Sequence, residues 1–201
     1  MRPQRRLLIL SKKSDAQIMR KLLLLIYYGF AWHLPSQPMP GWKFAYAVRR
    51  FLVKRIFQSC GEGVVVKQHA YFGEGNTLNV GNRVRIGINS RIDRDVTLGD
   101  DVMIGQDVVI LTSGHAYEDP TVPINQQGAA KSRPVKIGRD VLVGTRVVIL
   151  PGVKIGEGSV IGAGSIVRSN IPPFSVAAGN GARVFWKRGQ FLKKTHSKLE
   201  G

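Results

Sequence analysis

Cysteine is nearly absent from this chain, and aromatic residues are few. The 201 residues include one cysteine, Cys60. A single cysteine excludes an intrachain disulfide and any metal site built on several thiolates, and it fits a reducing compartment. Aromatic residues make up 8% of the chain, whereas glycine is frequent, with 23 residues. This balance favours a chain of repeated tight turns over a bundle of helices.

The sequence also lacks a long hydrophobic run. Its most apolar stretch is LLLLIYYGFAWHL at residues 22–34. Thirteen residues are too few for a simple membrane span, which needs about 20. The stretch has no small-residue cleavage site, which argues against a secretory signal peptide. Together with the lone cysteine, these features predict a cytoplasmic protein.

Acidic residues are scarce at both ends, and this scarcity produces the net charge of +17. Residues 1–60 hold 12 Lys and Arg against Asp15 alone, and residues 183–201 hold 6 against Glu200 alone. Residues 61–182 are nearly neutral, with 12 basic and 11 acidic residues. Basic ends suit a nucleic acid, an anionic membrane or a phosphorylated ligand. No nucleic-acid-binding motif accompanies them, so nucleic acid is not an expected partner.

The apolar run at residues 22–34 has basic neighbours on both sides. Arg20 and Lys21 precede it, and five cations follow it, namely Lys43, Arg49, Arg50, Lys54 and Arg55. A helix lying on the inner face of an anionic membrane has this composition. A helix packed on the body of the protein or on a neighbouring subunit has it too. Both interpretations remain open on the sequence alone.

Aliphatic residues recur at every sixth position through the middle of the chain. One series is Val80, Ile86, Ile92, Leu98, Ile104 and Ile110, and the other is Ile137, Val143, Ile149, Ile155, Ile161 and Val167. A second column lies four positions on, as in Val84, Val96, Val102, Val108, Val141, Val147 and Val153, or five on at Val160 and Ile166. Neither a helix nor simple strand alternation has this period. A six-residue strand-and-turn unit has it, and three units make one triangular coil of about 18 residues that stacks in parallel on the next.

The series is interrupted once. Ile110 and Ile137 lie 27 positions apart, which is not a multiple of six. Residues 112–134 are therefore predicted to leave the coil as an extended loop, which contains His115. Long ordered excursions from a regular scaffold usually carry function.

Several blocks of the sequence resemble the hexapeptide-repeat acetyltransferases. These are the loop block GHAYEDP at 114–120 and the C-terminal blocks VKIGRDVLVG at 135–144, LPGVKIG at 150–156, VIGAGSIV at 160–167 and GNGAR at 179–183. The likeness is greatest to the maltose, galactoside and nodulation-factor O-acetyltransferases and to the acetyltransferases of capsule, colanic acid and O-antigen clusters. The resemblance implies an all-β solenoid, a left-handed parallel β-helix with an N-terminal helical segment and a short C-terminal helix. It also implies a homotrimer.

The resemblance further implies an acetyl-CoA-dependent O-acetyltransferase that acts on a sugar hydroxyl in surface polysaccharide biosynthesis, without a metal. His115 is the expected general base. Its second ring nitrogen needs a partner, and Glu118, Asp119 and a backbone carbonyl all remain candidates. The saccharide acceptor is expected at Asn89 and Asp93, although turns favour such residues for structural reasons alone. Loop residues Glu118, Asp119 and Gln127 are expected to bind the acceptor as well.

Coenzyme A is expected at the C-terminal coils. Thr145, Ala163, Arg168 and Arg183 match positions that contact it in the family, and Gly144, Lys187 and Arg188 are assigned to the same site. Solvated charge is the alternative for each basic residue. The chain departs from the family where Leu142 replaces a frequent Trp, where Gly181 replaces a Pro, and where Arg168-Ser169 replaces a Lys.

The remaining candidates for chemistry are expected to be structural. His33, His69 and His196 lie outside the loop, and Cys60 has no histidine motif beside it, so direct transfer in a ternary complex is preferred to an acyl-enzyme. Two alternatives stay open: an N-acetyltransferase of an amino sugar or a small xenobiotic, and a non-catalytic scaffold. The sequence argues against a metal hydratase of the carbonic anhydrase type. Such an enzyme needs three histidine ligands, and only His69 and His115 lie in or near the coils.

The predicted organisation has three parts. Residues 1–60 form a basic, apolar helical segment. Residues 61–182 form the β-helix with its extended loop at 112–134, and residues 183–201 form a basic tail.

Overall fold

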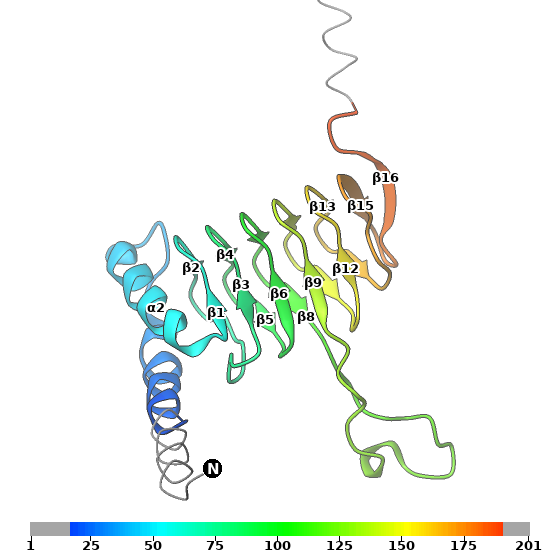
Figure 1. Cartoon of the computed structure of the whole chain (residues 1–201), viewed down its shortest axis with the longest axis horizontal. Helices are drawn as coiled ribbons and strands as arrows, with labels where there is room; N and C mark the ends of the chain where they lie inside the picture. Colours follow the sequence, from blue (N-terminus) through cyan, green and yellow to red (C-terminus); the bar gives the residue numbers. More distant parts are fainter. Residues whose placement is uncertain (1–16, 191–201) are drawn as a thin grey trace, which may run out of the picture.

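The computed structural model describes residues 17–190, which form a triangular prism of stacked coils capped at one end by helices (Figure 1). The cap consists of a helix over residues 17–29, the 3-10 helix η1 (Ala31–His33) and α2 (Trp42–Ile56). The coils run from there to the opposite end, where the chain turns back on itself. No helix within residues 17–190 is long and apolar enough to cross a membrane.

Three sheets form the sides of the prism within the described residues. The first holds β1 (Ser59–Cys60), β3 (Asn79–Val80), β6 (Val96–Leu98), β9 (Val135–Ile137) and β12 (Lys154–Ile155). The second holds β2 (Val65–Val66), β4 (Arg85–Ile86), β7 (Met103–Ile104), β10 (Leu142–Val143), β13 (Val160–Ile161), β15 (Ser175–Ala178) and β16 (Arg183–Lys187). The third holds β5 (Arg91–Ile92), β8 (Val109–Ile110), β11 (Val148–Ile149) and β14 (Ile166–Val167).

The strand register confirms the predicted parallel β-helix. Arg91 in β5 pairs in parallel with Val109 in β8, which lies 18 positions further along the chain. Leu98 in β6 pairs with Ile137 in β9, although residues 112–134 intervene. The loop is therefore inserted between two coils without shifting the register. All twelve residues of the first aliphatic column are buried, with at most 4% of their surface exposed.

The second column differs from its sequence pattern in the last coils. There the sequence placed the aliphatic residue one position later, at Val160 and Ile166, and both are only half-buried. The interior positions belong instead to Ser159 and Ser165, which are fully buried. Ser159 Oγ donates to the carbonyl of Pro172 at 2.9 Å, and Ser165 Oγ donates to the carbonyl of Gly162 at 2.6 Å. A buried hydroxyl with a partner costs little, so the coil keeps its period of six.

The cap is joined to the first coil by polar contacts from its interior. Tyr27 donates its hydroxyl to the carbonyl of Ala70 at 2.9 Å. Arg49 is fully buried, and its guanidinium donates to the carbonyls of Ala31 at 2.9 Å and Val66 at 3.3 Å. Two of the three acceptors, the carbonyls of Ala70 and Val66, belong to the first coil, so these bonds fasten the cap to it.

The other end of the prism differs from expectation. Residues 183–187, at the start of the predicted basic tail, form β16, which pairs antiparallel with β15, and no helix lies within residues 183–190. A hairpin here covers the last coil, whose strand edge would otherwise be open. Residues 191–201 of the predicted tail lie outside the described residues.

Candidate active site

His115 lies on a loop that projects away from the prism (Figure 1). The root of this His115 loop, residues 112–134, is tied to the coils: Arg133 N donates to the Thr112 carbonyl at 2.7 Å, and Ser132 Oγ donates to Asp95 Oδ2 at 2.6 Å. His115 itself forms an antiparallel bridge with Ala129. The neck of the loop is therefore a short two-stranded ribbon, which holds the exposed His115 at a defined position.

The predicted orienting carboxylates do not contact His115. Glu118 accepts a hydrogen bond from the backbone N–H of Tyr117 at 3.1 Å. Asp119 Oδ1 accepts from both the N–H and the hydroxyl of Thr121, at 2.8 and 2.6 Å. These two hydrogen bonds, and above all the one from the hydroxyl, hold the pKa of the Asp119 carboxyl below its usual value. The His115 imidazole has no hydrogen-bond partner among residues 17–190, so the loop by itself does not complete a catalytic site.

The sequence predicts that Gln127 binds the acceptor, but the Gln127 side-chain amide forms its hydrogen bonds inside the loop. Its Nε2 donates to the carbonyls of Asp119 at 2.8 Å and Val122 at 2.7 Å. Its Oε1 accepts from the N–H of Asp119 at 3.2 Å. Gln127 therefore ties the two sides of the loop together.

A cavity of about 550 Å³ lies beside the root of the loop. Its lining includes Tyr71, Arg91, Asp93 and Ser113. Asp93 accepts a hydrogen bond from Arg91 Nε at 3.3 Å and one from the N–H of Thr112 at 3.4 Å. This carboxylate therefore connects the cavity to the loop root. Tyr71, Arg91 and Ser113 were not among the predicted residues, since only the folded coil brings them together.

Asn89 lies apart from this Asp93 cavity. It adopts the left-handed conformation with a φ of 55°, and its Nδ2 donates to Asp107 Oδ1 at 3.1 Å. Asn and Asp tolerate that conformation better than most residues. The structure thus gives Asn89 the turn role that was its alternative.

The predicted coenzyme A residues divide into two groups. Gly144, Thr145 and Ala163 stack at one corner of the prism, where a Cβ on Gly144 would lie 2.6 Å from the nitrogen of Ala163. The backbone N–H groups of Thr145 and Ala163 donate to no acceptor within residues 17–190. Such free groups can pair with the amides of an extended ligand. We call this the Thr145 corner.

Arg168 follows β14 in the third sheet, and Arg183 begins β16. The Arg168 guanidinium packs on Gly181, where a Cβ would meet Arg168 Nε at 3.0 Å. The glycine that replaces the family's proline therefore leaves room for this arginine. Arg183 pairs with Ala178, whose side chain lies 2.8 Å from the place of a Cβ on Gly162, one residue before Ala163.

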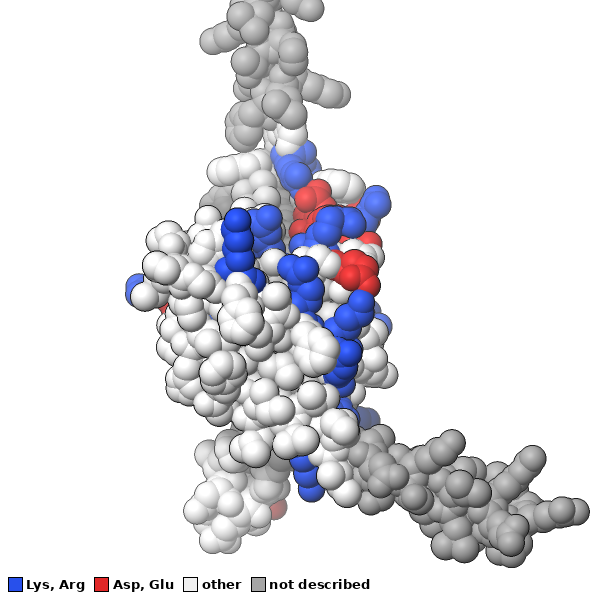
Figure 2. All heavy atoms as spheres, turned by 90° about the vertical axis from the view of Figure 1, so that its left-hand side faces the viewer, with Lys and Arg blue, Asp and Glu red and all other residues white. Residues whose placement is uncertain are grey.

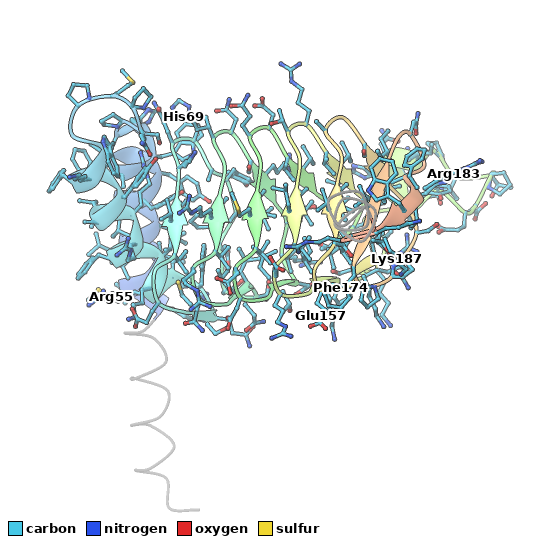
Figure 3. The ribbon with its side chains drawn as sticks, turned by 90° about the horizontal axis from the view of Figure 1, so that it is seen from above. Arg55, His69, Glu157, Phe174, Arg183 and Lys187 are labelled. Carbon is cyan, nitrogen blue, oxygen red and sulfur yellow. The ribbon has the colours of Figure 1, made fainter. Side chains whose placement is uncertain are left out.

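Lys187 and Arg188 belong to the other group. Arg183 and Lys187 mark opposite ends of β16 (Figure 3), which are about 13 Å apart at 3.3 Å per residue. Lys187 Nζ donates to the carbonyl of Pro173 at 3.1 Å, and Arg188 Nη1 donates to Asp140 Oδ2 at 2.7 Å. These two cations fasten the hairpin to the coils and do not join the Thr145 corner.

The other candidate groups have structural surroundings. His33 and His69 pack against the ring of Trp32, at centroid distances of 5.1 and 4.6 Å. Burial raises the pKa of the Cys60 thiol, which makes it a weaker nucleophile at neutral pH. Within residues 17–190, no three His, Cys, Asp or Glu side chains come together as ligands for a metal ion.

Comparisons with known proteins agree with this architecture. The family profile described as bacterial transferase hexapeptide (six repeats) matches residues 134–169, and that of the hexapeptide repeat of succinyl-transferase matches residues 78–112. Galactoside O-acetyltransferase from Escherichia coli (strain K12) is 41% identical over 138 residues, which are 68% of this chain and 66% of that protein. A Staphylococcus aureus (strain MRSA252) protein named as an acetyltransferase is 45% identical over 71 residues, and the chain spans only 36% of its length.

Solved structures are similar over nearly the whole chain. A galactoside acetyltransferase in complex with coenzyme A has a TM-score of 0.72 and 34% identity, covering 90% of this chain and 84% of its own. A maltose O-acetyltransferase from Clostridium difficile 630 has a TM-score of 0.67 and 28% identity, covering 91% and 89%. The parallel coils, the loop that presents His115 and these similarities agree, and the chain belongs to the hexapeptide-repeat acetyltransferase family.

Proposed function

We propose that this protein transfers the acetyl group of acetyl-CoA to a sugar hydroxyl, with His115 as general base. The observation that carries the proposal is the position of His115. The ribbon that holds it emerges beside the Asp93 cavity, whose polar lining suits a saccharide. Thr145, Ala163 and Arg183 would bind the donor. The proposed acceptor belongs to surface polysaccharide.

The chemistry follows from the imidazole. One ring nitrogen accepts the proton of the sugar hydroxyl while the hydroxyl oxygen attacks the thioester carbonyl carbon. Backbone N–H groups would stabilise the negative charge on the carbonyl oxygen. When the C–S bond breaks, the imidazolium returns its proton to the coenzyme A sulfur. The products are the sugar acetate ester and coenzyme A, and His115 ends as it began.

We also propose a trimer in which each site forms between two subunits. The loop that carries His115 extends away from the prism (Figure 1), and the exposed imidazole has no hydrogen-bond partner among residues 17–190. A neighbouring subunit would supply the donor corner and the partner that orients the ring. A closed ring of three copies leaves no unpaired interface.

The helical cap supports a further proposal, that the protein lies on the inner face of the cell membrane. Large apolar side chains are exposed there, among them Leu25 at 70%, Phe44 at 64% and Phe51 at 56%. Figure 2 shows this end of the molecule with blue Lys and Arg side chains beside a broad surface of neither charge. Exposed apolar patches bordered by cations are typical of contact with anionic lipid.

The proposed reaction is tested by incubating the protein with acetyl-CoA and a panel of soluble sugars, followed by mass spectrometry of the products. His115→Ala is expected to lower kcat by about 10²- to 10⁴-fold, the usual contribution of a general base. Its thermal unfolding and coenzyme A binding should match the parent protein. Acetylation of amines instead of hydroxyls, or full kcat in His115→Ala, would contradict the assignment.

A further inference from the structure

A second cavity, of about 370 Å³, lies between α2 and the first coils. Its lining consists of Gln37, Trp42, Lys43, Tyr46, Arg50, Val65, Lys67 and Arg85. Four of these eight residues are cations and none is acidic. They come from α2, β4 and the turn after β2, so only the folded chain assembles them. We call this the basic cavity.

The cations of the basic cavity form no ion pairs within the described residues; Glu62, which pairs with Lys54, acts on Arg50 only at longer range. Exposed cations elsewhere form ion pairs: Arg83 bonds to Asp101 at 2.6 Å, and Arg139 bonds to Glu157 at 2.8 Å. Lys43, Arg50, Lys67 and Arg85 take part in no ion pair among residues 17–190. Four like charges around one hollow repel one another, and an anionic ligand would relieve that repulsion.

The backbone at this cavity favours an anion as well. Trp42 and Lys43 stand in the first turn of α2, which contains no acidic residue and has no side-chain cap at Gly41. A helix N-terminus carries partial positive charge, so a lysine in its first turn is destabilising unless an anion is near. The fifteen-residue α2 therefore adds to the field of the four side chains.

The aromatic wall of the cavity is rigid. The rings of Trp42 and Tyr46 meet edge to face with centroids 5.3 Å apart, and the Tyr46 hydroxyl accepts the N–H of Gln37 at 3.1 Å. The Arg50 side chain is fixed to the first coil because its Nε donates to the Val64 carbonyl at 3.1 Å. The half-buried Trp42 ring therefore offers an aromatic face beside the cations, which suits a sugar or a base attached to phosphate.

The position of the basic cavity relates it to the proposed reaction. Lys67 and Arg85 also line a neighbouring hollow of about 230 Å³, whose other wall includes Leu142 and Thr145. The basic cavity and the Thr145 corner therefore lie along the same side of the prism, at different coils. A ligand phosphate in the basic cavity would be separate from the predicted coenzyme A contacts at Ala163 and Arg183.

We infer that the basic cavity binds the phosphate or diphosphate of a phosphorylated acceptor, so that the saccharide is presented to acetyl transfer as a glycosyl phosphate ester. This inference rests on the proposed function for its link to catalysis. The shared chemistry is a phosphoryl group, which a nucleoside diphosphate sugar and a lipid-linked glycosyl diphosphate both carry.

Binding is tested on the full chain by calorimetry at low salt, with inorganic pyrophosphate as the probe. Pyrophosphate should bind the parent protein, and Lys43→Ala/Arg50→Ala should weaken it at least tenfold. Lys136→Ala/Lys154→Ala removes two exposed cations from a different face and should leave binding unchanged. Absent binding to the parent protein, equal binding to the Lys43→Ala/Arg50→Ala protein, or displacement of pyrophosphate by coenzyme A would each overturn the inference.

Two further experiments distinguish a soluble from a lipid-linked source of the phosphate, and the phosphate-binding inference from the proposed acetyl transfer. UDP-glucose in solution and polyprenyl diphosphate in phosphatidylcholine vesicles are compared as competitors of pyrophosphate, and displacement by either supports the inference. If neither displaces it, the inference fails. His115→Ala should bind pyrophosphate like the parent protein, so a failure of the proposed acetyl transfer would leave this binding result standing. With a phosphorylated and an unphosphorylated acceptor, Lys43→Ala/Arg50→Ala should raise KM for the phosphorylated one selectively.

Discussion

Gln127 and Asp119 are joined by two hydrogen bonds across the His115 loop: the Gln127 side-chain amide donates to the Asp119 carbonyl at 2.8 Å, and its oxygen accepts the Asp119 N–H at 3.2 Å. This pairing copies the pattern of two facing strands, with a side chain in place of one strand. The tip of the loop thereby acquires a fixed shape, although it is exposed and has little apolar contact.

Gln127→Ala is therefore expected to loosen the loop. Its side chain makes three hydrogen bonds, and each contributes about 1 kcal/mol, so local opening should become on the order of a hundredfold more frequent. Limited proteolysis should cut the loop faster, and kcat should fall while the KM for acetyl-CoA stays the same. Gln127→Glu, which keeps the acceptor but loses both donors, should behave similarly. Unchanged proteolysis with a raised KM for the sugar would instead favour the acceptor-binding role.

The sequence predicted the coils because their cause is local and repeated. A buried aliphatic residue at every sixth position is visible in the sequence, and the break before Ile137 places the loop. The buried Ser159 and Ser165 were missed because each depends on a carbonyl acceptor that the aliphatic pattern does not mark, which for Ser165 is Gly162, three positions back. Pro172, which accepts from Ser159, lies 13 positions away.

The site was less predictable for the same physical reason. The sequence predicts His115 from its place in the extended loop. The hydrogen-bond partners of Gln127, Asp119 and Lys187 depend on which distant segments the folded chain brings beside them. The basic cavity joins Gln37 to Arg85, which no motif connects. Strand β16 was also missed. Its pairing with β15 depends on the turn between these two strands, which follows the last coil.

The buried Tyr27 and the half-buried Tyr28 of the cap should make stability depend on alkaline pH. Burial raises the pKa of both Tyr27 and Tyr28 above the ordinary value near 10. The folded protein then keeps protons that the unfolded chain loses, so the free energy of unfolding is full below about pH 10 and falls as the pH rises above it. Urea unfolding between pH 8 and 11 should show this decline.

The matched variants identify the groups responsible. Tyr27→Phe/Tyr28→Phe should be less stable at pH 8, because the carbonyls of Ala70 and Gly73 lose their donors. Its stability should nevertheless vary less between pH 8 and 11. Tyr117→Phe removes a hydroxyl from an exposed ring and should keep the full decline. An equal decline in all three proteins would contradict the assignment.

The proposed sharing of sites between subunits is open to a complementation experiment. His115→Ala lacks the base, and Ala163→Trp should block the Thr145 corner, so each protein alone is expected to be inactive. When the two are unfolded and refolded together, some interfaces unite an intact loop with an intact corner, and activity should return. A site built within one subunit would stay inactive in every mixture, whatever the oligomeric state.

The last prediction concerns binding of the helical cap to lipid. Phe44 and Phe51 lie seven positions apart on α2 and so share a face, and Leu25 belongs to the neighbouring helix of the same cap. Full burial of one such side chain is worth about 1.5–3 kcal/mol, and each nearby Lys or Arg adds about 1 kcal/mol against anionic lipid. In a cyclic trimer all three caps face the same way along the symmetry axis, so their contributions act together.

The protein should therefore sediment with phosphatidylglycerol vesicles at low salt, less so at high salt, and poorly with phosphatidylcholine vesicles. The triple variant Leu25→Ser/Phe44→Ser/Phe51→Ser should stay in the supernatant and acetylate a soluble sugar at the parent rate. The control is Phe185→Ser, which changes an exposed aromatic residue at the opposite end and should sediment like the parent protein. If the triple variant instead lowers the oligomeric state, the cap is an interface between copies of the chain, and the helices serve packing rather than the membrane.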